Sequence, residues 1–295
     1  MRKLSTLLLS LAAVGALALG ACADDGQTSS VATRTLSLTF DGLPELGAGY
    51  VYEGWIIVDG AAVSTGRFTV DDAGALTPAS FSVPAAQADA AAMFVLTLEP
   101  AVGDDPAPSD VHLLGGDVMG GAAALDVDHA AAIGTAFDSA AGGYMLATPT
   151  SAASDDDAQG LWYLRTEAGA PMASLTLPTL PAGWVYEGWV VGPDGPVSTG
   201  RFTDAAMADD DLAGATSGPD DGPPFPGQDF IDPAKVLTGG YAAVISVEPD
   251  PDDSPGPFVI KPLMDADIEA VAAPMTQPLA NIAADTLPMG SAMFE

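Results

Sequence analysis

One segment occurs twice in this chain. Residues 52–68 begin with Tyr-Glu-Gly-Trp and end with Val-Ser-Thr-Gly-Arg-Phe, and residues 186–202 repeat these words 186 − 52 = 134 positions later without a gap. Ten of the 17 aligned positions are identical. Such a long spacing is typical of a duplicated domain, because the units of solenoid proteins are only about 20–50 residues long. The sequence therefore predicts two related domains.

Each copy has the pattern of a β-hairpin, in which aromatic and β-branched residues flank a short turn. In the first copy, a three-residue loop centred on Gly60 would place Glu53 opposite Arg67 and Ile57 opposite Val63. We expect the glutamate and the arginine to form a cross-strand ion pair that stabilises the hairpin. A β-bulge would shift this register.

The same register about Asp194 places Glu187 opposite Arg201 in the second copy. The functional alternative for both arginines is that they receive an anionic ligand. Trp55 and Trp189 lie in the middle of the predicted strands, where we expect their rings to fill a core rather than to stack on a sugar or peptide.

Short strand patterns separated by glycine, proline and aspartate turns fill most of the remaining chain, and no strong amphipathic helix pattern accompanies them. This pattern predicts an all-β protein with two tandem β-sandwich (Ig-like) domains. We expect residues 144–148 to complete the first domain and the turn-rich tail to end in a closing strand. The predicted segments are a signal peptide (1–21), a lipidated tether (22–34), the first sandwich (35–150), an acidic linker (151–160) and the second sandwich (161–295).

The amino terminus has the features of an export signal. Arg2 and Lys3 precede an apolar stretch at residues 4–19, and the sequence Leu-Gly-Ala-Cys that ends at Cys22 resembles a bacterial lipobox. Cys22 is the single cysteine of the chain, so an intramolecular disulfide is excluded. The sequence predicts lipidation of Cys22, with ordinary cleavage nearby as the alternative. The expected location is therefore the envelope, facing the periplasm or the exterior. Because Ala23 stands where an aspartate would favour retention at the inner membrane, the outer membrane is expected if the host has one.

The chain is strongly acidic, with 40 acidic and 8 basic side chains and a formal net charge of −32. Such a charge repels phosphates and anionic lipid headgroups, which argues against nucleic acid as a partner and leaves the lipid anchor as the contact with the membrane. We interpret most of the acidic side chains as a solvated surface and expect no cofactor. Calcium is the alternative, since hard cations take carboxylate oxygens, although no EF-hand spacing is present. The candidate ligands are Asp209, Asp211, Asp250 and Asp252.

No catalytic motif is recognisable. His112 and His129 are the two histidines, and neither a paired-histidine motif, a Gly-x-Ser-x-Gly elbow nor a phosphate-binding glycine loop is present. The sequence therefore predicts a protein that is not an enzyme. An envelope hydrolase that uses a carboxylate pair is the alternative.

Both copies resemble the extracytoplasmic domain of anti-sigma-K factors. That domain has a Tyr-x-x-Trp strand, a Val-Ser-x-Gly-x-Phe return strand and a later apolar strand that ends in Glu-Pro. The matching positions are Tyr52, Trp55, Val63, Ser64, Gly66, Phe68, Glu99 and Pro100 in the first copy, and Tyr186, Trp189, Val197, Ser198, Gly200, Phe202, Glu248 and Pro249 in the second. The resemblance implies a β-rich envelope module associated with sensing. Regulatory members also carry a cytoplasmic sigma-binding domain and a membrane helix, which we do not find here, so sigma-factor sequestration is not implied.

We therefore expect a lipid-anchored, non-enzymatic envelope protein that recognises a protein or ligand, or senses envelope conditions. The alternative is a regulator of sigma-factor activity that acts through a separate membrane-bound anti-sigma partner. The second copy carries extra residues within the segment 204–235, and a functional surface is expected where the copies differ.

Overall fold

The polypeptide folds almost entirely into antiparallel strands. The computed structural model describes residues 31–252, 254–271 and 273–295. The predicted signal peptide and Cys22 lie outside the described residues. The stretch Ala32–Glu295 forms one compact unit. The all-β prediction is confirmed, and the single α-helix of the described residues is short, α1 (Ala85–Ala90).

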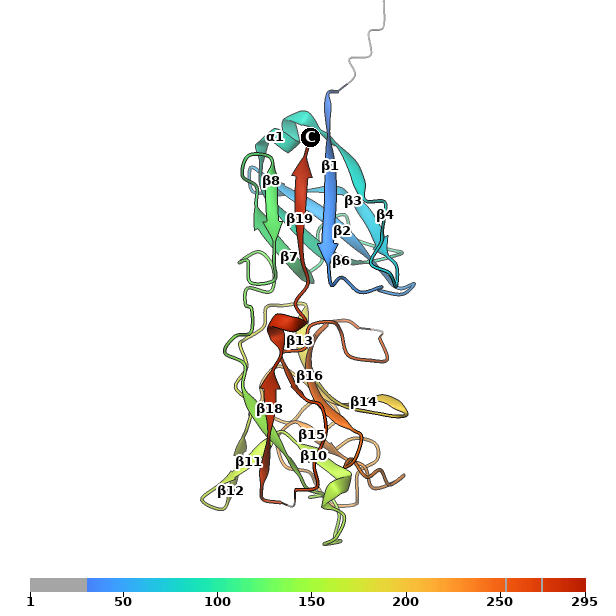
Figure 1. Cartoon of the computed structure of the whole chain (residues 1–295), viewed down its shortest axis with the longest axis vertical. Helices are drawn as coiled ribbons and strands as arrows, with labels where there is room; N and C mark the ends of the chain where they lie inside the picture. The colour runs from blue at the N-terminus through green and yellow to red at the C-terminus, as the bar shows by residue number, and fades with distance from the viewer. Residues whose placement is uncertain (1–30, 253, 272) are drawn as a thin grey trace, which may run out of the picture. The chain divides into compact units, whose positions relative to one another are not determined.

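Two antiparallel sheets are built from the first strands of the chain together with its last strand. These strands are β1 (Thr33–Asp41), β2 (Tyr50–Val58), β3 (Ala61–Val70), β4 (Leu76–Thr77), β5 (Ser80–Pro84), β6 (Ala91–Pro100), β7 (His112–Asp117), β8 (Ala122–Leu125) and β19 (Met289–Phe294). One sheet has the order β5-β1-β19-β8 and the other has the order β4-β3-β2-β6-β7. Figure 1 shows β19 between β1 and β8.

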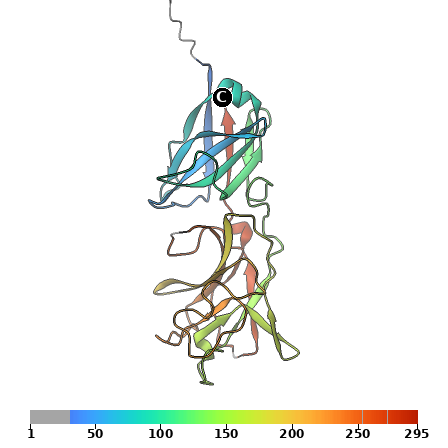
Figure 2. The same ribbon diagram turned by 180° about the vertical axis from the view of Figure 1, so that it is seen from behind.

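The two sheets pack face to face across an aromatic core. Phe40 of β1 stacks on Phe68 of β3 with ring centroids 5.6 Å apart, and Tyr52 of β2 stacks on the same ring at 5.4 Å. Seen from behind, strands of the five-stranded sheet cross in front of β19 (Figure 2). This part of the chain is a two-layered arrangement of antiparallel sheets, as a β-sandwich requires.

A single eight-stranded sheet takes up most of the remaining chain. Its strands are β9 (Gly142–Leu146), β10 (Gly160–Trp162), β13 (Trp184–Gly192), β14 (Gly195–Phe202), β15 (Gly227–Asp229), β16 (Ala242–Pro249), β17 (Leu263–Asp265) and β18 (Thr276–Asn281). Their order is β14-β13-β16-β17-β18-β9-β10-β15, and the end strands β14 and β15 contact each other. The sheet is therefore a nearly closed barrel, which differs from the second sandwich that the sequence predicted.

Smaller elements complete the described part of the chain. They are the two-stranded sheet of β11 (Leu164–Glu167) and β12 (Ala170–Ala173), and the short 3₁₀ turns η1 (Asp157–Gln159) and η2 (Ala283–Asp285).

The strand pairing does not follow a simple order along the chain. Strand β9 pairs with β10 and β18, so residues 144–148 do not complete the first pair of sheets as predicted. The last strand, β19, does not close the barrel but pairs with β1 and β8 near the start of the chain. The tail thus ends in a closing strand, but that strand belongs to the four-stranded sheet.

The turn of the first hairpin, β2–β3, is tighter than predicted. It consists of Asp59 and Gly60 alone, with φ angles of 51° and 80°. Positive φ at both positions is the geometry of a type I′ turn, which matches the twist of the flanking strands. Ile57 therefore lies opposite Ala62 instead of Val63, and the predicted pairing at this end of the hairpin was wrong by one residue.

A β-bulge at Thr65 compensates for the shorter turn. Beyond the bulge the register returns to the predicted one, and Glu53 lies opposite Arg67. Gly66 follows the bulge with a φ of +127°, and a Cβ atom there would lie 2.6 Å from the ring of Phe81. Both the backbone conformation and the space therefore require glycine.

The second hairpin, β13–β14, has a turn of the same length and the same bulge. Gly192 pairs with Gly195 across a two-residue turn, the register shifts between Glu187 and Trp189, and Glu187 lies opposite Arg201. The repeated words of the sequence thus specify the same bulged hairpin twice, although the sheets around the two copies differ.

Candidate functional site

Both bulged hairpins carry an ion pair at the same position. The Nε atom of Arg67 lies 2.7 Å from Oε2 of Glu53, and that of Arg201 lies 3.2 Å from Oε2 of Glu187. Both glutamates are buried, while the arginines are about a third and a quarter exposed, with side chains 34% and 26% accessible. The second oxygen of each glutamate accepts a hydrogen bond from a hydroxyl across the hairpin, that of Ser64 or Ser198.

A second glutamate lies on the strand next to each hairpin. Glu99 of β6 and Glu248 of β16 are both fully buried. Oε1 of each accepts hydrogen bonds from a hydroxyl two residues earlier (Thr97 or Ser246) and from a backbone N–H ten residues later. Oε2 of each has no hydrogen-bond partner among the described residues. An unsatisfied buried carboxylate oxygen is costly and requires an explanation.

The tryptophans of the repeated segment join this arrangement. The indole N–H of Trp55 donates to Thr97 Oγ1 at 2.9 Å, and that of Trp189 donates to Ser246 Oγ at 2.7 Å. Both rings are buried. The two copies therefore have the same polar network, built from six equivalent strand positions. We call Glu53, Trp55, Ser64, Arg67, Thr97 and Glu99 the first network, and Glu187, Trp189, Ser198, Arg201, Ser246 and Glu248 the second network.

The two networks differ in the aspartates that join them, which come from the loop after β6 in the first network and from the loop after β16 in the second. In the first, Asp104 pairs with Arg67. In the second, Arg201 lies 3.3 Å from Asp252 and 3.7 Å from the more exposed Asp250.

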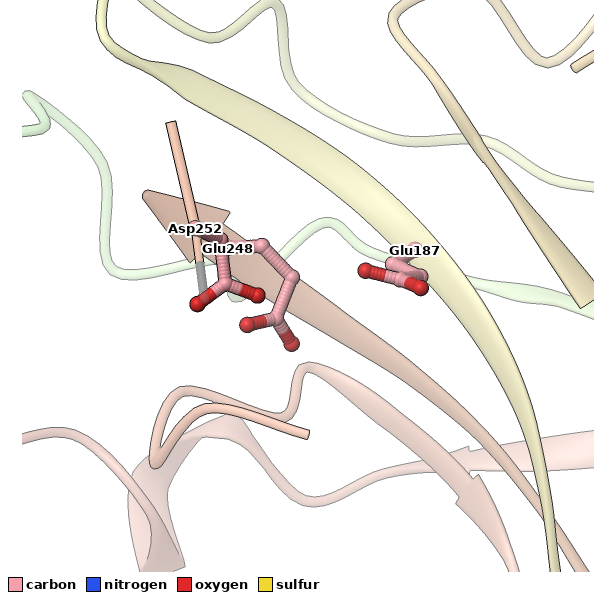
Figure 3. A group of neighbouring side chains, drawn as sticks. All are labelled: Glu187, Glu248 and Asp252. Atoms are coloured by element: carbon pink, nitrogen blue, oxygen red, sulfur yellow. The ribbon is translucent and has the colours of Figure 1, made fainter. Parts of the chain in front are cut away.

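Asp252 also meets the two glutamates of the second network. Glu187, Glu248 and Asp252 each place a carboxylate oxygen within 4.8 Å of the others. Figure 3 shows the carboxyl groups of Glu248 and Asp252 beside each other, with Glu187 approaching from the neighbouring strand. No other group of three acidic, histidine or cysteine side chains gathers in this way within the described ranges. We call these three residues the acidic triad.

Burial and like charge weaken the acidity of this cluster. Burial raises the pKa of Glu248 to about 7, against the effect of its hydrogen bonds from Ser246 and from the backbone of Phe258. Burial also raises the pKa of Glu187, to which the charge of Asp252 adds. Such shifts mark sites where a charged group lacks full compensation.

The structure divides the four aspartates that were candidate calcium ligands. Asp252 belongs to the acidic triad, and Asp250 pairs with Arg201 at the margin of the same site. Asp209 and Asp211 lie elsewhere, in the loop after β14, and belong to no such three-residue group in the part of the chain that the structure describes.

Asp209 should give the stability of the protein a distinct pH dependence. Burial raises its pKa to about 8, the charges of Asp211 and Asp210 act in the same direction, and the hydrogen bond from the backbone N–H of Gly227 opposes them. A carboxyl group with a raised pKa binds its proton more tightly in the folded state, so its contribution is present at low pH and is lost as the pH rises through about 8. We expect the free energy of unfolding to fall between about pH 4 and about pH 8, and to fall less in Asp209→Asn.

Urea unfolding at several pH values measures the free energy of unfolding of the wild type and of Asp209→Asn. The slope of this free energy against pH gives the number of protons that unfolding releases. Near pH 6 the unfolding of the wild type should release about one proton more than that of the variant. Parallel pH profiles for the two proteins would contradict the assignment.

The two histidines do not contribute to the networks. His112 contacts the carbonyl of Ala131 at 3.0 Å, and His129 lies 3.6 Å from a carboxylate oxygen of Asp117.

Sequence reasoning missed the roles of Glu99 and Glu248. Each precedes a proline at the end of an apolar strand, and the repeated Glu-Pro entered the sequence analysis as a strand end and a position of the family pattern, not as a buried carboxylate. A carboxylate that recurs within an apolar run was the signal that could have identified both residues, because charged side chains are rarely buried without a partner.

Comparison with known proteins identifies the first part of the chain. Residues 11–112, about a third of the sequence, match the family described as Anti-sigma-K factor rskA, C-terminal. The match detects one copy of this domain and no second copy. It extends from before the described residues to the start of β7, and so includes the first hairpin and Glu99. The chain thus contains an anti-sigma-K factor C-terminal-like domain, a kind of domain that is typically extracytoplasmic.

No curated protein and no solved structure matches the chain. Among the residues that the structure describes, no helix combines the length and the apolar character needed to cross a membrane.

Proposed function

We propose that this chain is a lipid-anchored, non-enzymatic protein of the bacterial cell envelope that recognises a protein or ligand, or senses conditions, outside the cytoplasm. The observation that carries the proposal is the match of residues 11–112 to the anti-sigma-K factor C-terminal domain, since that domain is typically extracytoplasmic. A folded module of antiparallel sheets suits a recognition role, because rigid sheets hold loops of variable sequence in fixed positions.

The predicted lipobox supports the anchor. Lipid on Cys22 would hold the folded part at the membrane surface through the short polar segment that follows it. In this proposal the protein faces the periplasm or the exterior, on the outer membrane in a host with two membranes.

The second network supports the proposal that the recognition module arose by tandem duplication. Glu187, Arg201 and Glu248 reproduce the pairing and burial of Glu53, Arg67 and Glu99. The surrounding sheets differ, which is consistent with a second copy that has diverged beyond the range of the family match. The barrel and its loops are then the place where a distinct specificity would lie.

A second candidate function is regulation of sigma-factor activity through a separate membrane-bound anti-sigma partner. The family match is the observation that favours it, because this domain takes its description from anti-sigma factors. The two candidates differ in the partner that they require.

Chemical crosslinking in intact cells, followed by purification of the tagged protein under denaturing conditions, tests both. The general proposal expects a specific envelope protein or envelope polymer to be captured, and the second candidate expects a membrane protein with an anti-sigma domain. Specific capture of cytoplasmic proteins alone would contradict both. A variant without the signal sequence serves as the control for contacts made after cell lysis.

A further inference from the structure

The acidic triad distinguishes the second network from the first. Both networks contain two buried glutamates and an arginine, but among the residues that the structure describes only the second has a third carboxylate that approaches both glutamates. Three carboxylates that converge on one point repel one another unless a positive charge lies between them. Arg201 pairs with Glu187 at 3.2 Å and with Asp252 at 3.3 Å, but among the described residues no cation forms an ion pair with the third carboxylate, Glu248.

The buried oxygen of Glu248 is an independent sign of a compensating cation. Glu248 is fully buried, and its Oε1 already accepts two hydrogen bonds. Its Oε2 has no partner among the described residues, and the carboxyl group lies beside that of Asp252 (Figure 3). A carboxylate oxygen without any donor, held beside two further carboxylates, is in the position of a metal ligand.

The charged side chains in and around the triad leave an excess of negative charge. Among the described residues, the triad and Asp250 supply four formal negative charges, against two positive charges from Arg201, which pairs with Glu187, Asp250 and Asp252, and Lys261, whose charge acts on Glu248. The remainder, 4 − 2, is the charge of one divalent cation.

The spacing also suits a particular kind of ion. Calcium binds oxygen at about 2.3–2.6 Å, so two of its ligands can lie up to about 5 Å apart. The oxygens of the triad, which all lie within 4.8 Å of one another, can therefore reach a common calcium ion. Calcium accepts six to eight oxygens, and waters would complete the shell (about three to five of them).

We propose that Glu187, Glu248 and Asp252 bind one calcium ion. The ion would join β13, β16 and the loop after β16, and would fix that loop against the second hairpin. The inference is independent of the proposed function, because it rests on the geometry of the triad and not on the family match.

The first network provides a matched control. Glu99 occupies the position of Glu248 and has the same unpartnered oxygen, but no third carboxylate joins it and Glu53 within ligand distance of a common ion in the described part of the chain. Removing its charge should leave calcium binding intact.

Thermal unfolding of the full chain in detergent, after chelation and with calcium added back, tests the proposal. A ligand that binds only the folded state raises the melting temperature, here by about 5 °C when calcium is well above its dissociation constant. The wild type and Glu99→Gln should show this rise. Glu248→Gln and Asp252→Asn should lose it, and Asp252 lies in a loop, where its replacement should leave the fold intact.

Terbium luminescence supplies a second measurement that does not depend on stability. Terbium replaces calcium on oxygen ligands, and Trp189 donates to the hydroxyl that bonds Glu248, so excitation of tryptophan should sensitise a bound ion. Calcium should reverse this emission, and Asp252→Asn should lack it. The proposal would be overturned if calcium changed neither the melting temperature nor the terbium emission of the wild type. It would also be overturned if both changes were equally large in Asp252→Asn, which would assign calcium binding to the acidic surface in general.

Discussion

Replacing Cys22 with alanine is expected to abolish the incorporation of labelled palmitate and to release the protein from the membrane fraction. The thiol of Cys22 is the proposed attachment point, and no other cysteine could replace it. Because Cys22 carries the whole of the proposed lipid anchor, its replacement should abolish membrane association completely rather than weaken it. Metabolic labelling and fractionation of cells measure both consequences.

Ala23→Ser is the control for this experiment, since it alters the next residue and keeps the cysteine. It should be labelled like the wild type. Equal labelling of Cys22→Ala and wild type would show that the lipobox was misidentified, and ordinary cleavage near residue 22 would then be the better interpretation.

Replacing Arg67 with methionine is expected to destabilise the protein by about 2–3 kcal/mol. The side chain of Glu53 is only 7% exposed, and Arg67 supplies its charged partner at 2.7 Å. Removal of one member leaves a buried charge without compensation, which costs about 3–5 kcal/mol when burial is complete; the 34% exposure of Arg67 reduces the effect. Urea unfolding measures the loss.

Two further variants separate this explanation from a loss of packing. The double variant Glu53→Gln, Arg67→Met should recover part of the stability, because the more deeply buried of the two carboxylates that Arg67 pairs with is then neutral, while Asp104 keeps its charge. Arg34→Met breaks a pair with Asp89 in which both side chains are exposed, at 42% and 56%, and should cost less than about 1 kcal/mol. Equal losses in Arg34→Met and Arg67→Met would show that burial of the pair does not govern its contribution.

The register of the hairpins shows how far local sequence determines structure. A three-residue loop predicted that Glu53 faces Arg67, and the structure has that pairing. It arises differently, because a two-residue turn moves the register by one position and the bulge at Thr65 moves it back. Glycines in the repeated words permit both features, but their spacing alone does not reveal where a bulge lies. The pairing of Ile57 was accordingly mispredicted.

Contacts between distant parts of the chain were beyond such reasoning. Strand β19 pairs with β1 across more than 250 residues, as in the pairing of Leu36 with Phe294. Both strands alternate in the way that any half-buried strand does, so the sequence of either one does not select its partner. The same limit explains why the closure of the barrel was not predicted.

The acidic triad shows a third limit. The chemistry of Asp252 makes it a candidate ligand in the sequence, but the sequence does not reveal which carboxylates lie beside it. Glu187 and Glu248 are 61 residues apart in the sequence, and the pairing of β13 with β16 brings their strands together. A surplus of acidic residues, with 40 along the chain, conceals the few that are buried. Burial, and not composition, identifies them.

The location of the folded part tests the account most directly. A β-lactamase joined through a flexible linker to the carboxyl terminus protects a bacterial host from a β-lactam antibiotic only when it has been exported. We predict full resistance with the native amino terminus and none when residues 1–21 are removed. Resistance that does not depend on residues 1–21, or its absence from both fusions when both are expressed at equal levels, would contradict the proposal that this protein acts outside the cytoplasm.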